Sequence, residues 1–191
     1  WRVHGTTDIP CPTAIVGDGL LVSTSGANGP ITAIRPGGDG DVTASHVLWR
    51  LPHGGPYVPT GVIVDDHLHL VSDGGILRCL DVRTGAEKWS QRLQRTHSAS
   101  LVAGDGKIYA ASEDGVIHVF AAGDPCQLLA VNRLRQPCQA TPAIADGALF
   151  VRTEQHLYCF ASQATPLVER SRGPGEHTTI STSMAGKPAG N

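Results

Sequence analysis

The sequence is poor in aromatic residues and in charge. Of its 191 residues, 5% are Phe, Trp or Tyr and 17% are charged, and the formal net charge is -2. A hydrophobic core must therefore be built largely from Val, Leu, Ile and Ala. The nearly balanced charge gives no electrostatic case for binding nucleic acid or an anionic membrane surface. No apolar run approaches the roughly 18 residues that a membrane-spanning helix needs, so no such segment is predicted.

Several patterns typical of enzymes and metal sites are also missing. The sequence has no Gly-x-Ser-x-Gly nucleophile elbow, no phosphate-binding glycine loop and no Cys-x-x-Cys pair. Its cysteines are five in number, Cys11, Cys79, Cys126, Cys138 and Cys159. Cys79 and Cys159 lie in the similar runs Leu-Arg-Cys-Leu and Leu-Tyr-Cys-Phe, which predicts small buried core residues. Cys126 and Cys138 could form a disulfide in an oxidising compartment or remain free thiols.

What the sequence does contain is a unit of about forty residues that recurs in register. Pairs of identical residues are separated by 40 positions: Trp49 and Trp89, Asp65 and Asp105, Ser72 and Ser112, Gly75 and Gly115, Phe120 and Phe160. Such a period is typical of stacked supersecondary units that cannot bury their apolar faces alone. No window keeps a helical period of 3.6 residues for ten or more residues, which excludes an α-helical repeat.

The second unit shows what each repeat contains. Its apolar runs predict four strands, at 60–64, 68–72, 76–81 and 88–92. Turns rich in Asp and Gly separate the strands, as tight antiparallel connections require. The inner strands are nearly continuously apolar, which indicates that both of their faces are packed. Four short antiparallel strands per forty residues describe one blade, so the predicted fold class is an all-β propeller.

We divide residues 1–161 into four predicted blades. They span about 5–51, 57–93, 97–134 and 138–161, and the last contains three strands. The first carries an insertion at 35–46 before Trp49, and the third has Leu129 where the period would place a tryptophan. Residues 162–191 contain few large apolar residues and show no periodicity, which predicts a disordered tail.

Two arrangements of these blades are open. The chain could be a fragment that forms an arc of a longer ring. Alternatively, it could close as a small four-bladed ring in which Trp1–Val3 supplies the fourth strand of the last blade, since Trp1-Arg2 repeats the Trp49-Arg50 dipeptide. We favour the arc, because the chain starts inside what resembles the end of a strand.

The stretch Leu80-Asp81-Val82-Arg83-Thr84-Gly85-Ala86-Glu87-Lys88-Trp89 resembles the tryptophan docking motif of the pyrroloquinoline-quinone-like propeller repeats. The resemblance covers about residues 10–161. It implies that a turn at Thr84-Gly85 precedes an indole that packs into the neighbouring blade, which gives a structural role to Trp49, Asp81, Thr84, Gly85 and Trp89. It also implies a ring of seven or eight blades. The outer-membrane-protein assembly lipoproteins of this family have similar repeats, which implies a periplasmic or cell-envelope location and protein partners bound through the propeller rims.

Quinoprotein dehydrogenases of the same family hold pyrroloquinoline quinone between a tryptophan and a disulfide of adjacent cysteines, beside a calcium ion. None of these features matches this sequence, because no two cysteines are adjacent and all three tryptophans fall at fourth-strand positions. We therefore expect a non-catalytic scaffold or binding module with no catalytic residue, metal or cofactor on this chain. The alternative is the C-terminal part of a quinone-dependent dehydrogenase whose quinone and calcium site lies outside these residues.

Acidic residues recur in the turns between the second and third strands. Asp73, Asp114 and Glu154 occupy such turns, and Arg152 adjoins the last of them. Together they would line one rim of the propeller and could bind a cation or a basic peptide. Acidic residues in turns more often accept hydrogen bonds from nearby backbone amides, so the set is a weak candidate binding site.

His67 and His69 alternate along one predicted strand and so share a face. A two-histidine metal site would need a third ligand, and none has a recognisable spacing. We predict an outward-facing pair, with Leu68 and Leu70 turned towards the core.

Overall fold

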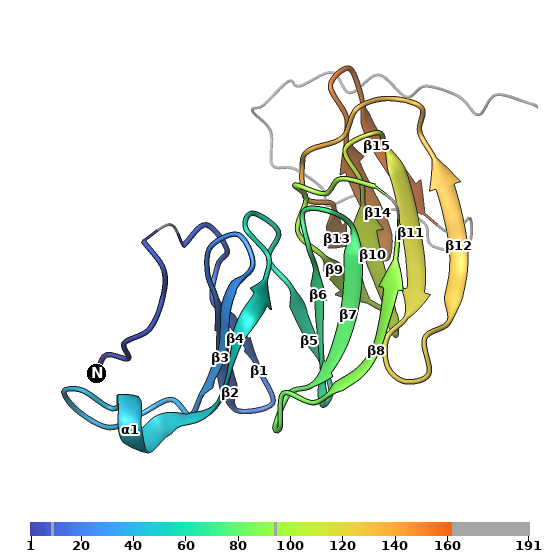
Figure 1. Cartoon of the computed structure of the whole chain (residues 1–191). Helices are drawn as coiled ribbons and strands as arrows, with labels where there is room; N and C mark the ends of the chain where they lie inside the picture. Colours follow the sequence, from blue (N-terminus) through green and yellow to red (C-terminus); the bar gives the residue numbers. More distant parts are fainter. Residues whose placement is uncertain (9, 94, 162–191) are drawn as a thin grey trace, which may run out of the picture.

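The computed structural model describes residues 1–8, 10–93 and 95–161, and the predicted disordered tail at 162–191 lies outside them. The chain forms four antiparallel sheets arranged side by side like blades of a fan (Figure 1). Blade 1 contains β1 (Ile15–Gly17), β2 (Leu20–Thr24), β3 (Gly29–Ile34) and β4 (Val47–Gly55), with the short α1 (Thr43–His46) before β4. Blade 2 contains β5 (Val62–Val64), β6 (His67–Val71), β7 (Ile76–Asp81) and β8 (Glu87–Arg92).

The second half of the fan repeats this order. Blade 3 contains β9 (Val102–Gly104), β10 (Lys107–Ala111), β11 (Val116–Ala121) and β12 (Leu128–Arg133). Blade 4 has three strands, β13 (Ala143–Ala145), β14 (Ala148–Arg152) and β15 (Leu157–Ala161). The first strands of successive blades lie next to one another, since β1 contacts β5, β5 contacts β9 and β9 contacts β13. The predicted all-β propeller arc is confirmed.

The tight turn after each first strand explains the recurring aspartates. Asp18, Asp65, Asp105 and Asp146 all have positive φ, between 49° and 52°. This left-handed conformation matches the twist of a two-residue hairpin, and Asp tolerates it better than most residues. The same local chemistry thus builds the same hairpin in each blade.

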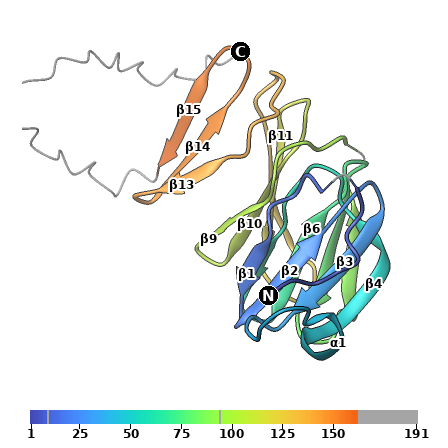
Figure 2. The same ribbon diagram turned by 90° about the vertical axis from the view of Figure 1, so that its left-hand side faces the viewer.

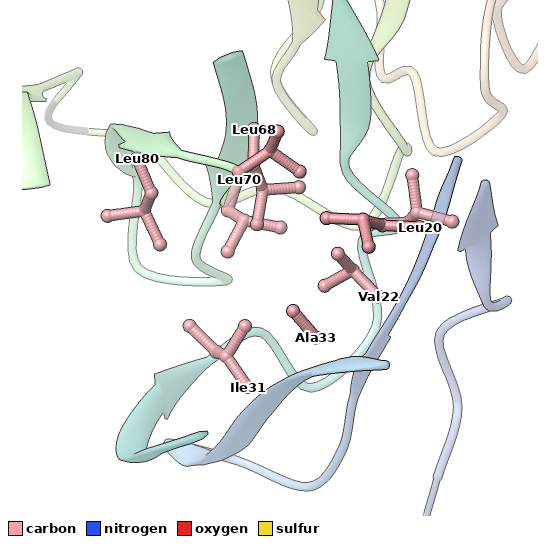
Figure 3. Close-up of a cluster of buried hydrophobic side chains, with 9 residues drawn as sticks. Leu20, Val22, Ile31, Ala33, Leu68, Leu70 and Leu80 are labelled. Atoms are coloured by element: carbon pink, nitrogen blue, oxygen red, sulfur yellow. The ribbon is translucent and has the colours of Figure 1, made fainter. Parts of the chain in front are cut away.

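The core consists of apolar layers between blades rather than one central cluster. Leu20, Val22, Ile31 and Ala33 of blade 1 lie against Leu68, Leu70 and Leu80 of blade 2 (Figure 3). Similar clusters join blade 2 to blade 3 and blade 3 to blade 4. Each inner sheet is therefore packed on both of its faces.

This double packing overturns the prediction for the histidine pair. His69 is fully buried, as are Leu68 and Leu70 on the opposite face of β6. The His69 ring lies 5.7 Å from the ring of Trp89, between blades 2 and 3. Neither ring nitrogen has a hydrogen-bond partner. The outward-facing pair was wrong because a strand inside a stack of blades has no solvent-facing side.

The burial of each cysteine depends on the blade in which it lies. Cys79 is fully buried, as predicted. Cys159 occupies the equivalent strand position in blade 4 but is exposed, because no further blade among the described residues covers that face. Cys126 and Cys138 are both free thiols. The Cys138 thiol donates a hydrogen bond to the Arg152 carbonyl oxygen at 3.3 Å.

Strand register decides between the two arrangements of the blades and corrects one predicted position. Trp1–Val3 does not complete blade 4, since Arg2 forms a parallel bridge with Asp41 in the loop of blade 1. The described residues therefore form the favoured arc and not the alternative closed ring of four blades. The position of the tryptophan in blade 3 is held by Ala130 rather than Leu129, because Ala130 pairs with Val119 as Trp89 pairs with Cys79. The turn before β12 is one residue longer than the turn before β8, and this shifts the forty-residue period.

Candidate functional site

The tryptophans of blades 1 and 2 tie successive blades together. The Trp49 Nε1 donates a hydrogen bond to the carbonyl oxygen of Val82, at 2.9 Å, and the Trp89 Nε1 donates to that of Gly123, at 2.8 Å. Each acceptor lies in the loop between the third and fourth strands of the following blade. Both indoles are partly buried. The indoles thus bridge the interface between neighbouring blades, which we call the seam, at the level of the outer, fourth strands.

The turn that receives Trp49 is built by three residues. The Asp81 Oδ1 accepts hydrogen bonds from the Thr84 N–H at 2.9 Å, the Arg83 N–H at 3.1 Å and the Thr84 hydroxyl at 2.9 Å. The hydrogen bond from the Thr84 side chain is the main cause that lowers the pKa of Asp81. Gly85 has φ of 74°, and a Cβ there would lie 2.8 Å from the Trp49 ring. Only glycine gives the turn its conformation and leaves room for the indole.

The acidic rim residues have structural partners. The Asp73 carboxylate accepts hydrogen bonds from the Tyr57 N–H at 2.7 Å and the Val58 N–H at 3.1 Å. Asp114 accepts from the Ser112 hydroxyl at 2.6 Å and forms an ion pair with Arg95. These contacts fix the segments that connect one blade to the next.

The exact counterpart of Asp73 in blade 3 is Glu113, one residue before Asp114. Ser72 and Ser112 precede them in equivalent turns, and each serine hydroxyl accepts a hydrogen bond from the N–H four residues on. Glu113 accepts hydrogen bonds from the hydroxyls of Thr96, at 3.1 Å, and Ser98. Alignment of the Ser-acid pairs in the sequence could have identified it.

The four predicted rim residues do not form one site. Asp73 borders a groove of about 540 Å³, whereas Arg152 and Glu154 border a smaller one of about 180 Å³ on blade 4. Asp114 borders neither of them. Among the described residues, no three His, Cys, Asp or Glu side chains are placed to hold a metal ion together.

The larger groove, of about 540 Å³, lies between blades 1 and 2 on the rim. We call it the blade 1–2 groove and define it by Asn28, Gly54, Tyr57, Asp73, Arg78 and Ser90. The turn between β2 and β3 supplies Asn28, the end of β4 supplies Gly54, and the turn between β6 and β7 supplies Asp73. Of these residues, only Asp73 was predicted from the sequence as part of a binding site. The groove forms where two blades meet, so no motif within one repeat marks it.

The polar groups of the groove are held in fixed positions. The Arg78 Nε and Glu87 Oε2 form an ion pair at 2.6 Å, and the Arg78 guanidinium lies against the backbone of Gly54. Asn28 Oδ1 accepts a hydrogen bond from the Gly54 N–H at 3.0 Å. Tyr57 is 37% exposed. The groove thus combines both signs of charge with an aromatic ring, and no histidine lies in its lining. Groups of these kinds can bind polar and aromatic partners.

Comparison with solved structures agrees with the class that this architecture defines, a β-propeller of four-stranded blades. BamB from Moraxella catarrhalis is 18% identical with a TM-score of 0.63, over 78% of this chain and 46% of that one. The computationally designed Ika4 protein is 16% identical with a TM-score of 0.67, and the match covers 84% of this chain and 95% of the Ika4 chain. The designed Ika8 protein is 17% identical with a TM-score of 0.62, and the match covers 78% of this chain and 45% of the Ika8 chain. These likenesses show the fold. The chain spans less than half the length of the BamB structure.

Two overlapping matches to one family model cover most of the sequence, at residues 27–128 and 73–183. The chain belongs to the family described as outer membrane protein assembly factor BamB, with pyrroloquinoline-quinone-like repeats. No curated protein matches the sequence. No helix in the described part of the chain is long and apolar enough to cross a membrane.

Proposed function

We propose that the chain is part of a non-catalytic propeller scaffold of the bacterial cell envelope, which binds a protein partner through the blade 1–2 groove. The observation that carries this proposal is the groove itself, a rim depression with a fixed Arg78–Glu87 ion pair and the half-exposed ring of Tyr57. Tyrosine and arginine are enriched at protein interfaces. The family description, which concerns the assembly of outer membrane proteins, supports the envelope location and a protein as partner.

Photo-crosslinking tests this role. A photoreactive amino acid placed at Ser90, in the lining of the groove, is expected to give a specific adduct with an envelope protein in cells. The same amino acid at Leu129, on the exposed outer strand β12, provides the matched control. Adding Tyr57→Ala to the Ser90 variant should reduce the adduct at least about threefold, because an interface aromatic commonly contributes a kcal/mol or more. Identical adducts from both positions, or an adduct unaffected by Tyr57→Ala, would contradict the proposal.

The alternative is that the chain forms part of a quinone-dependent dehydrogenase. The structure also resembles a europium-containing methanol dehydrogenase, with 11% identity and a TM-score of 0.50, and the match covers 72% of this chain and 27% of the dehydrogenase chain. The residues present do not fit a quinone site. The indoles of Trp49 and Trp89 are engaged at seams between blades, and no adjacent cysteines occur. The described residues bring no set of carboxylates together around a shared centre.

A redox assay separates the two functions. With added pyrroloquinoline quinone and calcium, the chain is expected to reduce no dye with a panel of alcohols and aldoses, because the residues that the structure describes form no quinone or calcium site. Heat-denatured chain is the control for background reduction. Calcium-dependent turnover above that background would contradict the scaffold proposal in favour of the dehydrogenase.

A further inference from the structure

The groove between blades 1 and 2 has a counterpart at the next seam. Figure 2 shows blade 1 facing the viewer, with β6 of blade 2 behind it, and the blade 1–2 groove lies where these two blades meet. A second groove, of about 320 Å³, lies between blades 2 and 3. We call it the blade 2–3 groove and define it by Arg92, His118, Phe120, Cys126, Leu128 and Val131. Each groove takes part of its lining from the third and fourth strands of the blade that follows the seam.

The two grooves can be compared position by position, because blades 2 and 3 have the same strand register. Three strand positions line both grooves. They hold Arg78, Glu87 and Ser90 in the blade 1–2 groove, and His118, Leu128 and Val131 in the blade 2–3 groove. The second seam thus packs without an ion pair at these positions, so the fold does not require one. The charged groups of the blade 1–2 groove therefore point to binding rather than to packing between blades.

The aromatic residue of the blade 1–2 groove also differs from its counterpart. The position forty residues after Tyr57 holds His97, in the segment between blades 2 and 3. His97 is 1% exposed, whereas Tyr57 is 37% exposed and lines the groove. The Tyr57 N–H donates a hydrogen bond to the Asp73 carboxylate at 2.7 Å. The aromatic residue and the carboxylate are therefore neighbours in the groove lining.

The Asp73 carboxylate is the charge of this groove that no cation balances. The other two charged side chains, Arg78 and Glu87, pair with each other at 2.6 Å. Within the described part of the chain, Asp73 forms no ion pair with a Lys, Arg or His side chain. It accepts N–H bonds from Tyr57 and Val58, which use about half of the roughly four acceptor sites of a carboxylate. The groove thus has a net negative charge and open acceptor sites beside an aromatic residue.

We propose that the blade 1–2 groove binds an arginine side chain of the protein partner, an inference that rests on the proposed function. A guanidinium is planar, stacks on aromatic rings and donates hydrogen bonds to a carboxylate, and Tyr57 and Asp73 offer both kinds of contact. The volume of about 540 Å³ lies within the range of roughly 300–1,000 Å³ for ligand pockets. An acidic side chain is a poorer occupant, because it would compete with Glu87 for Arg78 and would be repelled by Asp73.

Binding of two matched peptides tests this proposal. The probes are acetyl-Gly-Ser-Arg-Ser-Gly-amide and the same peptide with citrulline, which has the shape of arginine without its charge. Each peptide is titrated into the isotope-labelled chain, and the amide signals of Gly54 and Gly74, in the groove lining, are followed by NMR. The arginine peptide is expected to shift these signals and to bind about tenfold more tightly than the citrulline peptide, because hydrogen bonds between charged groups are stronger than neutral ones.

Charge changes at Ser90 should alter the affinity in opposite directions. Ser90 is exposed and lines the groove. Ser90→Lys should weaken binding of the arginine peptide at least about threefold, Ser90→Glu should strengthen it by a similar factor, and Ser90→Gln should leave it within about twofold. Leu129→Lys and Leu129→Glu, on the exposed outer strand β12, make the same charge changes outside the groove and should leave the affinity unchanged.

Substitution of Tyr57 tests the contact with the aromatic ring. Tyr57→Phe should keep the affinity for the arginine peptide, because it keeps the ring. Tyr57→Leu should lower the affinity about threefold, because an apolar side chain without a ring offers no cation–π contact. Both variants keep the backbone N–H that donates to Asp73.

Several results would overturn the inference. They are equal affinities for the two peptides, unshifted signals of Gly54 and Gly74, weaker binding in both Ser90→Lys and Ser90→Glu, or full affinity in Tyr57→Leu. If one of them accompanied a specific photo-adduct at Ser90, the proposed function would stand and only the choice of arginine would be wrong. A clear preference for the arginine peptide in a chain that forms no adduct in cells would support the arginine site and contradict the proposed function.

Discussion

Replacement of Trp89 by Ala is expected to destabilise the fold by about 3 kcal/mol, the lower end of the range for truncating a large packed aromatic residue. The indole packs in the cluster between blades 2 and 3, with its ring 6.4 Å from that of Phe120, and its Nε1 donates to the Gly123 carbonyl oxygen at 2.8 Å. The substitution removes both the packing and the hydrogen bond. Urea unfolding followed by circular dichroism measures the loss.

Two matched variants separate the contributions. Trp89→Phe should cost roughly 1–2 kcal/mol, since it keeps part of the ring contact and loses the hydrogen bond. Leu129→Ala should change the free energy of unfolding by less than about 0.5 kcal/mol, because Leu129 is 44% exposed on an outer strand. If Trp89→Ala cost no more than Leu129→Ala, the seam between blades 2 and 3 would not depend on the tryptophan.

Acid is expected to destabilise the protein through His69. Burial lowers the pKa of this imidazole to about 4, with repulsion from His67 as the smaller cause, against an ordinary value of 6.5. Between these two values the unfolded chain binds a proton that the folded chain excludes. The contribution of His69 is therefore fully present above about pH 6.5 and is lost as the pH falls towards 4. Between pH 7.5 and 5 the expected loss is about 2 kcal/mol.

Urea unfolding at the two pH values tests this prediction. His69→Phe should remove about 2 kcal/mol of the difference between pH 7.5 and 5, because the phenyl ring fills the space without a titrating group. Burial also lowers the pKa values of His97 and His118, so part of the acid sensitivity should remain. His53→Phe, on the exposed part of β4, is the control. If the free energy of unfolding of His69→Phe depended on pH as that of the parent does, His69 would have to be protonated in the folded protein at pH 5, contrary to the prediction.

The blade-by-blade architecture was predictable because its causes lie within each repeat. The positive φ of Asp65 and Asp105 follows from a hairpin whose turn residues are adjacent in the sequence. The Asp81–Thr84 hydrogen bonds likewise join residues three positions apart. Local turn chemistry and a forty-residue period are therefore enough to indicate the strands and the blades, whereas the family and the docking role of Trp89 were implied by the resemblance of residues 80–89 to a known motif.

Only the tertiary structure decided what lies between blades. The apolar pattern of β6 indicated that both of its faces are packed, but the sheet that covers His69 is about thirty residues away, and only the structure shows this contact. The blade 1–2 groove joins Asn28 to Arg78, which no repeat contains together. A single extra residue in the turn before β12 moved the tryptophan position from Leu129 to Ala130, because register follows the hydrogen-bond ladder rather than the sequence count. The sequence determined the blade as a local unit, and packing between units determined the burial of His69 and the position of the groove.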